Sequence, residues 1–187
     1  RRASFFALQI LDNCIRFRWR ALPVDQREGI KGYIVNVIVK YSADEAVLSR
    51  EKMYLGKLNL ILVQILKQEW PHNWDGFVPQ IVESGKGNEI LCENNMHILK
   101  LLSEEIFDFS AEQMTSQKIS QLKDSLTSQF SLIYQFCEFV LHNAKRPSLL
   151  KATLHCLLRY LSWVPLVFVF ETKLIETLVM KFFMEPA

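Results

Sequence analysis

The sequence predicts an all-α protein in which about four pairs of helices stack side by side as an α-α superhelix. Three observations predict this class. Apolar residues recur at every third or fourth position along most of the 187 residues, which is the spacing of one helix face. Only 6 Gly and 6 Pro occur, too few for a β fold with many turns. Long helices end at aromatic residues and are each followed by a second helix and a short polar loop, which indicates a repeating unit.

The first two helices are expected near residues 3–19 and 25–41. Residues 33–39 read YIVNVIV, a run rich in β-branched residues that could form a strand. The apolar positions nevertheless fit the helical spacing, and the neighbouring segments are helical, so a helix is predicted here. These positions are Ile30, Ile34, Val37, Ile38 and Tyr41.

The second pair is expected near residues 53–70 and 76–84. Its long helix is apolar on more than one side, which predicts that it lies between neighbouring helices instead of on the surface. The apolar positions are Leu55, Leu58, Leu60, Leu62, Val63, Ile65 and Leu66. Pro71 cannot continue a helix and disfavours helical backbone at Trp70, so the long helix should end there.

The last two pairs comprise helices near 89–107 and 119–141, then 149–163 and 173–183. The second of these carries one apolar stripe for about six turns, which predicts a single long helix. In 149–163 the expected buried stripe is Leu150, Leu154, Leu157, Leu158 and Leu161. Residues 164–170 are expected to form a turn with a buried apolar rim, because Pro165 breaks the preceding helix.

These helices define four expected units, at about residues 1–43, 44–87, 88–146 and 147–187. Helix pairs at an irregular period of about 40–60 residues are typical of HEAT-like and armadillo-like arrays. Such pairs cannot bury both of their faces alone, so stacked pairs share one core. The chain also begins at Arg1 without a Met, and it is expected to be a piece of something longer.

The charge is nearly balanced, with 22 Lys and Arg against 20 Asp and Glu. This balance gives no reason to expect a nucleic-acid partner. Residues 1–40 are basic, however, with 8 basic and 3 acidic side chains, which indicates either an anionic partner or ordinary solvated helix faces. The longest apolar run, 164–170, is far shorter than the ~20 residues of a membrane span, so no membrane partner is expected.

The sequence offers little catalytic chemistry. Two Glu/His pairs, Glu93 with His97 and Glu138 with His142, share a helix face at a spacing of four. A metal site would need a third or fourth ligand, and such pairs are more typical of helix surfaces. Further candidates are better explained as solvated or buried structural groups, and no cofactor, metal or enzyme activity is expected. They are His72, the carboxylates Glu104, Glu105 and Asp108, the dipeptide His155-Cys156, and Ser84–Gly87, which lacks the spacing of a phosphate loop.

The four cysteines, Cys14, Cys92, Cys137 and Cys156, lie far apart in apolar segments, and no C-x-x-C motif occurs. They are expected to be buried small hydrophobic residues. A reducing intracellular compartment fits this arrangement best.

The segment 57–74, KLNLILVQILKQEWPHNW, resembles the exportin branch of the importin-β (karyopherin) superfamily, in which a Lys-rich helix ends in Trp-Pro-x-x-Trp. Other blocks narrow the resemblance to one family within this branch, and together they cover about residues 5–183. These blocks are 28–31, 94–96, 98–105, 107–110, 157–166 and 170–175. Departures from the family pattern fall in loops and on helix faces, at 42–50, 111–120 and 167–169. The motif residues Trp70, Pro71, Trp74, Trp163 and Pro165 mark helix ends, and the three tryptophans are expected to be core residues between paired helices.

The resemblance implies an N-terminal segment of a nuclear export receptor, at about its second to fifth HEAT repeats. Such receptors bind Ran-GTP and leucine-rich export signals cooperatively, pass through the nuclear pore, and release cargo after GTP hydrolysis. The resemblance therefore implies a protein that shuttles between nucleus and cytoplasm and allows nucleoporins as partners. The export-signal groove would lie in later repeats, outside this chain.

The resemblance also implies that Ran contacts the second helix of each unit, near 25–41, 76–84, 115–142 and 172–184. The candidate contacts are Gln26, Lys31, Asn36, Gln80, Ser84, Lys118 and Gln121. Lys31 is favoured because it lies within a block that matches the family. The alternative is a generic helical-repeat scaffold, such as a phosphatase or kinase adaptor, that binds a partner other than Ran.

Overall fold

The computed structural model describes residues 2–108, 114–164, 169–170 and 172–184, and along these residues it contains helices and no strand. The all-α prediction is confirmed. The helices are α1 (Arg2–Arg18), α2 (Val24–Tyr41), α3 (Glu45–Arg50), α4 (Lys52–Glu69), α5 (Phe77–Gly85), α6 (Glu89–Phe107), α7 (Ser116–Ser128), α8 (Phe130–Asn143), α9 (Pro147–Leu161) and α11 (Leu174–Phe182), with a short 3₁₀ helix, η1 (Trp19–Ala21), after α1. None of them combines the length and apolar character of a membrane span.

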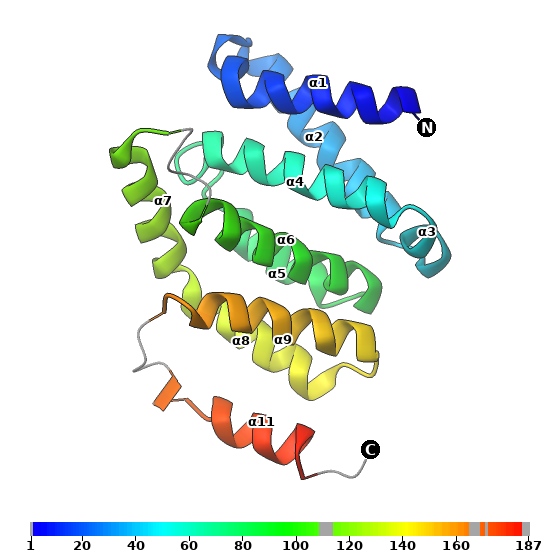
Figure 1. The fold of residues 1–187 in the computed structure, drawn as a ribbon, viewed down its shortest axis with the longest axis vertical. Coiled ribbons are helices and arrows are strands. Elements are labelled where there is room, and N and C mark those ends of the chain that lie inside the picture. Colours follow the sequence, from blue (N-terminus) through cyan, green and yellow to red (C-terminus); the bar gives the residue numbers. More distant parts are fainter. Residues whose placement is uncertain (1, 109–113, 165–168, 171, 185–187) are drawn as a thin grey trace.

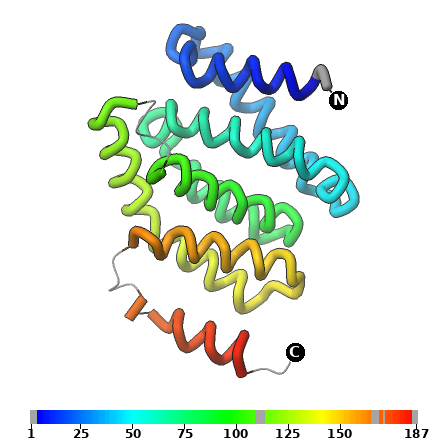
Figure 2. The backbone as a smooth tube through the Cα atoms, in the orientation of Figure 1, coloured from blue at the N-terminus to red at the C-terminus, as the bar shows by residue number. Residues whose placement is uncertain are grey.

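The helices stack in two layers. In the first layer α1, α4, α6 and α9 follow one another, each against the next (Figure 1). In the second layer α2 packs against α4, α5 against α6, and α8 against both α5 and α9. The backbone trace in Figure 2 shows this progression from the N-terminus to the C-terminus. The arrangement is the stacked-pair superhelix that the sequence pattern predicts.

The helix starts are set by short polar side chains. Asp44 accepts a hydrogen bond from the Val47 N–H at 3.0 Å and begins α3. Asn88 accepts from the N–H groups of Ile90 and Leu91 in the first turn of α6. Each of these caps satisfies a backbone donor that the helix itself leaves unpaired. The short helix α3 is not among the predicted elements.

The single long helix predicted over 119–141 is wrong, because the chain bends at Gln129 between α7 and α8. The N–H of Gln129 is shared between the carbonyls of Ser125 and Leu126. Thr127 and Ser128 hydrogen-bond with their hydroxyls to carbonyls of the preceding turn, a pattern that bends helices. The bend lets α7 pack against α6 while α8 packs against α5 and α9, which one straight helix could not do.

The stripe predicted for α9 is also wrong in its orientation. Leu158 is 69% exposed, and Leu150, Leu154 and Leu161 are only partly buried. The buried face is instead Leu149, Ala152, Thr153, Cys156, Leu157 and Tyr160. Periodicity alone cannot choose between two adjacent apolar faces of one helix, and here packing against α6 and α8 decides.

The centre of the stack is α4, which contacts α1, α2 and α6. Six of its seven predicted apolar positions are buried and the seventh, Leu60, is partly buried, as predicted for a helix between neighbours. Polar residues are buried there too, and each of the following has a partner. Asn59 and Asn94 exchange hydrogen bonds of 2.7 and 3.2 Å, and Lys67 pairs with Glu105 at 2.8 Å.

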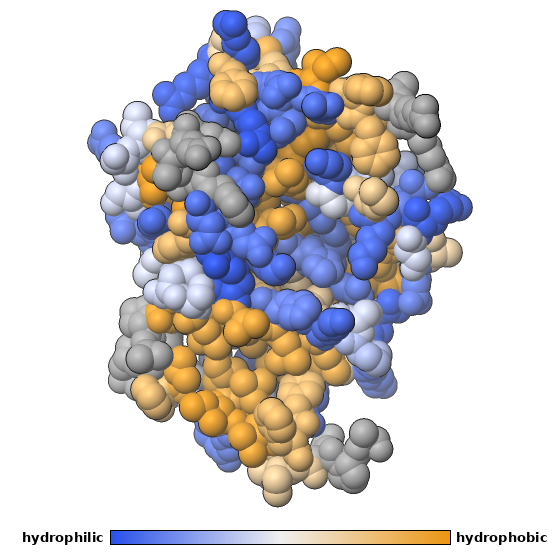
Figure 3. Space-filling view, in the orientation of Figure 1, coloured by the Kyte–Doolittle hydropathy of each residue, from blue (hydrophilic) through white to orange (hydrophobic). Residues whose placement is uncertain are grey.

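The C-terminal end of the stack is apolar and open. Figure 3 shows apolar side chains gathered over the end that carries α9 and α11. The exposed members include Leu158, Ile175, Val179, Met180 and Phe183. Of the predicted turn at 164–170, residues 165–168, including the motif residue Pro165, lie outside the described residues. At its edges Val164 is buried, whereas Phe170 is 74% exposed and does not form part of a buried rim.

Candidate functional site

The seven predicted contact residues lie on three helices, with Gln26, Lys31 and Asn36 on α2, Gln80 and Ser84 on α5, and Lys118 and Gln121 on α7. Five of them are exposed, while Lys31 and Lys118 are partly buried. The structure brings four of the seven into two groups of contacting or neighbouring side chains.

The first group, termed the Lys31 group, consists of Glu28, Lys31, Trp74 and Gln80. Lys31 Nζ lies 2.6 Å from Glu28 and 5.0 Å from the centre of the Trp74 ring. The Trp74 indole N–H donates to Gln80 Oε1 at 3.1 Å. An ammonium over an indole face is an electrostatically favourable arrangement. Trp74 therefore connects α2 to α5 and places Lys31 and Gln80 on one surface.

The three motif tryptophans were predicted to be core residues, and only Trp70 of the three is fully buried. Trp70 is 1% exposed and lies fully in the core. Trp74 is only partly buried against the core, beside Phe77, and Lys31 lies over its ring. Trp163 is also partly buried, stacked on Phe107 at 4.2 Å and donating to the Ser103 hydroxyl at 2.8 Å.

The second group surrounds the buried carboxylate of Glu69 at the end of α4. Lys118 and Gln121 line a cavity of about 310 Å³ together with Arg20, Arg27 and His72. Glu69 accepts hydrogen bonds from the Trp19 indole and from Arg27. Burial acts to raise the pKa of Glu69, but hydrogen bonds from Trp19, Asn73 and Arg27 and the charge of Arg27 outweigh it, so the pKa is lowered.

The other three predicted residues are not part of either group. Gln26 and Asn36 are exposed on α2. The Ser84 hydroxyl donates to the Ile81 carbonyl at 3.0 Å and accepts from Asn95 at 2.9 Å. Because both bonds are internal, Ser84 serves the packing of α5 against α6.

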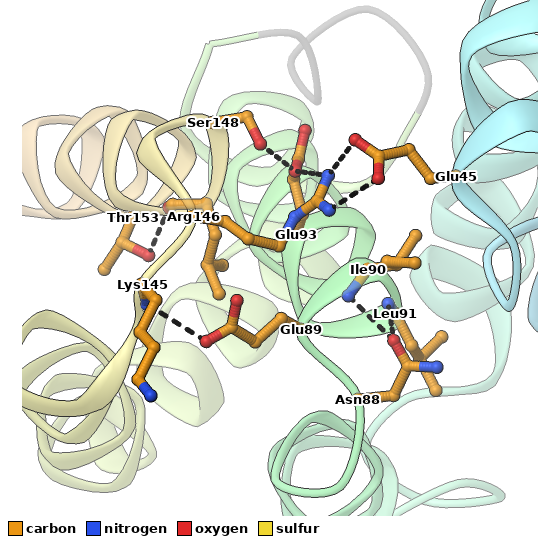
Figure 4. Close-up of polar contacts among 11 residues, drawn as sticks. Glu45, Asn88, Glu89, Ile90, Leu91, Glu93, Lys145, Arg146, Ser148 and Thr153 are labelled. Carbon is orange, nitrogen blue, oxygen red and sulfur yellow. Dashed lines mark hydrogen bonds and ion pairs between the residues drawn. The ribbon is translucent and has the colours of Figure 1, made fainter.

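A further polar cluster, which the sequence did not predict, joins α3, α6 and the start of α9 (Figure 4). Arg146, just before α9, donates to both carboxylate oxygens of Glu45 at 2.9 Å and lies 3.8 Å from Glu93. Glu93 also accepts a 2.6 Å hydrogen bond from Ser148. The hydrogen bond and charge of Arg146 lower the pKa of Glu45. Glu45 and Arg146 are 101 residues apart, so no local sequence signal could have indicated their contact.

Most of the Glu, Asp and His side chains considered as acid–base candidates form hydrogen bonds or ion pairs with other groups of the chain. Glu93 is engaged by Ser148 and Arg146, and burial lowers the pKa of His97. His142 contacts the backbone carbonyl of Glu138, not its carboxylate. Glu105 pairs with Lys67, Glu104 with Lys100, and Asp108 with Arg159. Within the described parts of the chain, no three His, Cys, Asp or Glu side chains are grouped as metal ligands.

The phosphate-loop candidate, Ser84–Gly87, is the end of α5 and the turn after it. Gly85 is buried, and a Cβ there would lie 2.5 Å from Phe136 Cζ. Lys86 pairs with Glu83. His72 and His155 are exposed, and Cys92, Cys137 and Cys156 are buried as free thiols.

Comparison with known proteins places these features in a family. Residues 51–187 match the family described as Exportin 1-like protein, and residues 2–40 match the importin-beta N-terminal domain. Protein EXPORTIN 1B of Arabidopsis thaliana is 55% identical over 184 residues, and Exportin-1 of Schizosaccharomyces pombe is 53% identical over 183. Exportin-5 of Homo sapiens is more distant, at 26% identity over 70% of this chain and 10% of its own length.

The alignments to the first two relatives cover 98% of this chain but only 17% of each relative. The chain thus corresponds to a small part of those proteins. The narrower resemblance to a single family within the exportin branch is confirmed. The fold, the order of the helices and these matches together show that the chain belongs to the exportin 1-like family.

Proposed function

We propose that this chain is a segment of a nuclear export receptor that binds Ran-GTP and helps carry proteins with leucine-rich export signals from nucleus to cytoplasm. The observation that carries the proposal is 53–55% identity to exportin-1 proteins over 98% of the chain. The stacked helix pairs support it, because such arrays present extended binding surfaces. In this role the chain acts by binding and not as an enzyme.

The proposed Ran surface is the layer of second helices, with the Lys31 group at its centre. Lys31 and Gln80 come from different units, yet Trp74 holds both on one surface. A partner that contacts two units at once is sensitive to the spacing between them as well as to their side chains. We include Gln26 and Asn36 of α2, and Lys118 and Gln121 of α7, as further candidate contacts for Ran.

The remaining partners are assigned by kinship. We place the export-signal groove in repeats outside this chain, so the segment alone should not bind a leucine-rich signal peptide. The intact receptor would shuttle between nucleus and cytoplasm and would meet nucleoporins in the pore.

The direct test is binding of the purified chain to Ran loaded with a non-hydrolysable GTP analogue and, separately, with GDP. Preference for the GTP form is expected. If neither form binds, the same comparison is made with the full-length receptor, where equal or absent binding would reject the Ran proposal in favour of a scaffold for another partner.

A charge reversal tests the Lys31 group itself. Lys31→Glu should weaken Ran-GTP binding by about fivefold, the scale of one partly exposed ion pair. Lys40→Glu makes the same charge change at an exposed position of α2 and is the matched control. Circular dichroism verifies that both variants remain helical. Equal affinities of the two variants at moderate salt would remove the Lys31 group from the proposed surface.

A further inference from the structure

A basic pocket lies where η1, α2, the end of α4 and the start of α7 meet. It is the cavity of about 310 Å³ whose lining includes Arg20, Arg27, Glu69, His72, Lys118 and Gln121. These residues belong to segments that are far apart in the chain. Four separate elements therefore converge to form the pocket, which distinguishes it from a run of charge along one helix face.

The pocket holds more positive charge than its own carboxylate can neutralise. Arg20, Arg27 and Lys118 are cationic, and among the lining residues that the structure describes Glu69 is the one carboxylate. Glu69 is already committed to Trp19 and Arg27. A net positive cavity favours an anionic ligand, because low-dielectric walls concentrate the field of the charges.

Donors in the pocket remain available to such a ligand. Among the residues that the structure describes, Lys118 Nζ donates to a neutral acceptor, the Trp70 carbonyl, at 2.7 Å. The Nε of Arg27 is buried and has no hydrogen-bond partner among the described residues. Arg20 is exposed and forms no ion pair within the described part of the chain. A buried donor without an acceptor is unfavourable, and an oxyanion would satisfy it.

Burial and the neighbouring charges both act on the pKa of Lys118. Burial lowers the pKa of Lys118, and the charge of Arg20 lowers it further, against the opposing effect of Glu69. A bound anion would relieve the repulsion between the two cations.

We propose that the basic pocket binds a carboxylate side chain from an acidic segment of a protein partner. Guanidinium groups bind carboxylates with paired, parallel hydrogen bonds. The exposed guanidinium of Arg20 offers such a pair, while Arg27 donates one of its N–H groups to Glu69. The inference rests on the proposed function only for the identity of the partner, Ran-GTP. Binding of a carboxylate by the pocket is a property of this chain that can be tested without Ran.

The experiment is a titration of the ¹⁵N-labelled 187-residue chain, followed through the indole N–H resonance of Trp19. This group lines the pocket and donates to Glu69, so it reports directly on occupancy. The probes are the blocked peptide acetyl-Glu-Asp-Glu-amide, its neutral analogue acetyl-Gln-Asn-Gln-amide, and inorganic phosphate. A saturable shift is expected with the acidic peptide and not with the neutral one.

Two variants identify the site. Arg20→Gln should weaken binding of the acidic peptide by about three- to fivefold, as for loss of an exposed ion pair. Arg18→Gln removes the same charge two positions earlier, from an exposed residue outside the pocket lining, and should leave binding unchanged. Both changes are at exposed positions, so folding is expected to be retained.

Three results would overturn the proposal. Equal responses to the acidic and neutral peptides would show that charge is not recognised, and equal affinities of the two variants would place the ligand elsewhere. Saturation by phosphate without a response to the acidic peptide would make the pocket a small-anion site. The Ran proposal has its own binding test, so rejecting one of the two proposals does not reject the other.

Discussion

Helices α4 and α11 are both apolar helices of one stack, yet their burial differs greatly. In α4, eleven residues are buried, whereas in α11 only Leu174 is. Helix α4 is covered by α1, α2 and α6, while Ile175 and Met180 of α11 are at least half exposed. Both helices carry apolar residues at helical spacing, so the spacing alone does not explain the difference. In a stacked array, the burial of a helix depends on neighbouring helices on both of its sides.

The largest expected effect is the loss of Trp70, which closes α4 and is 1% exposed. Trp70→Ala should lower the free energy of unfolding by about 3–5 kcal/mol, because it removes a large buried side chain and leaves a cavity. The measurement is urea unfolding followed by circular dichroism. Phe183→Ala is the matched aromatic change at the open end, where the side chain is 79% exposed, and it should change stability little. Similar losses for both variants would contradict the comparison.

A smaller effect is expected from a larger side chain where α5 packs against α8. A methyl group at Gly85 would meet Phe136 of α8 at 2.5 Å, so Gly85→Ala should destabilise by about 1–3 kcal/mol through overpacking. A methyl group at Gly87, two residues on, would have nothing within 4 Å. Gly87→Ala should therefore be neutral or slightly stabilising in the same unfolding measurement. Equal stability of the two variants would show that α5 and α8 separate easily.

The smallest effect is expected in the acid dependence of stability. The pKa of Glu69 is lowered in the folded chain from its ordinary value of 4.5, so its ionised form stabilises the fold above that pH. This contribution should be lost as the pH falls through the lowered folded-state pKa, because the unfolded chain then binds the proton more readily. The measurement is the pH dependence of the urea midpoint, in which Glu69→Gln should flatten the acid limb. Glu176→Gln, at an exposed position of α11, is the control, and an equal change in both variants would assign the effect to total charge.

The sequence predicted most of the helices and their order. The helix over the β-branched run 33–39 was identified correctly because its spacing of apolar residues outweighs residue preference. The break at Gln129 and the buried face of α9 were not predicted correctly, because both depend on which neighbouring helices are contacted. For the candidate site, the sequence pointed to Lys31 and Gln80 separately, and it held no signal for the Trp74 contact between them.

What the sequence by itself determined is local or comparative: helix spacing, the end of α4 before Pro71, and membership of the exportin 1-like family. Only the tertiary structure decided which charged groups meet. It joined Glu45 to Arg146 and gathered Arg20, Arg27 and Lys118 around Glu69. The physical reason is the separation along the sequence between the residues that are in contact. A helix forms through contacts three or four residues apart, whereas a surface shared by stacked units forms through contacts between distant segments that no local pattern records.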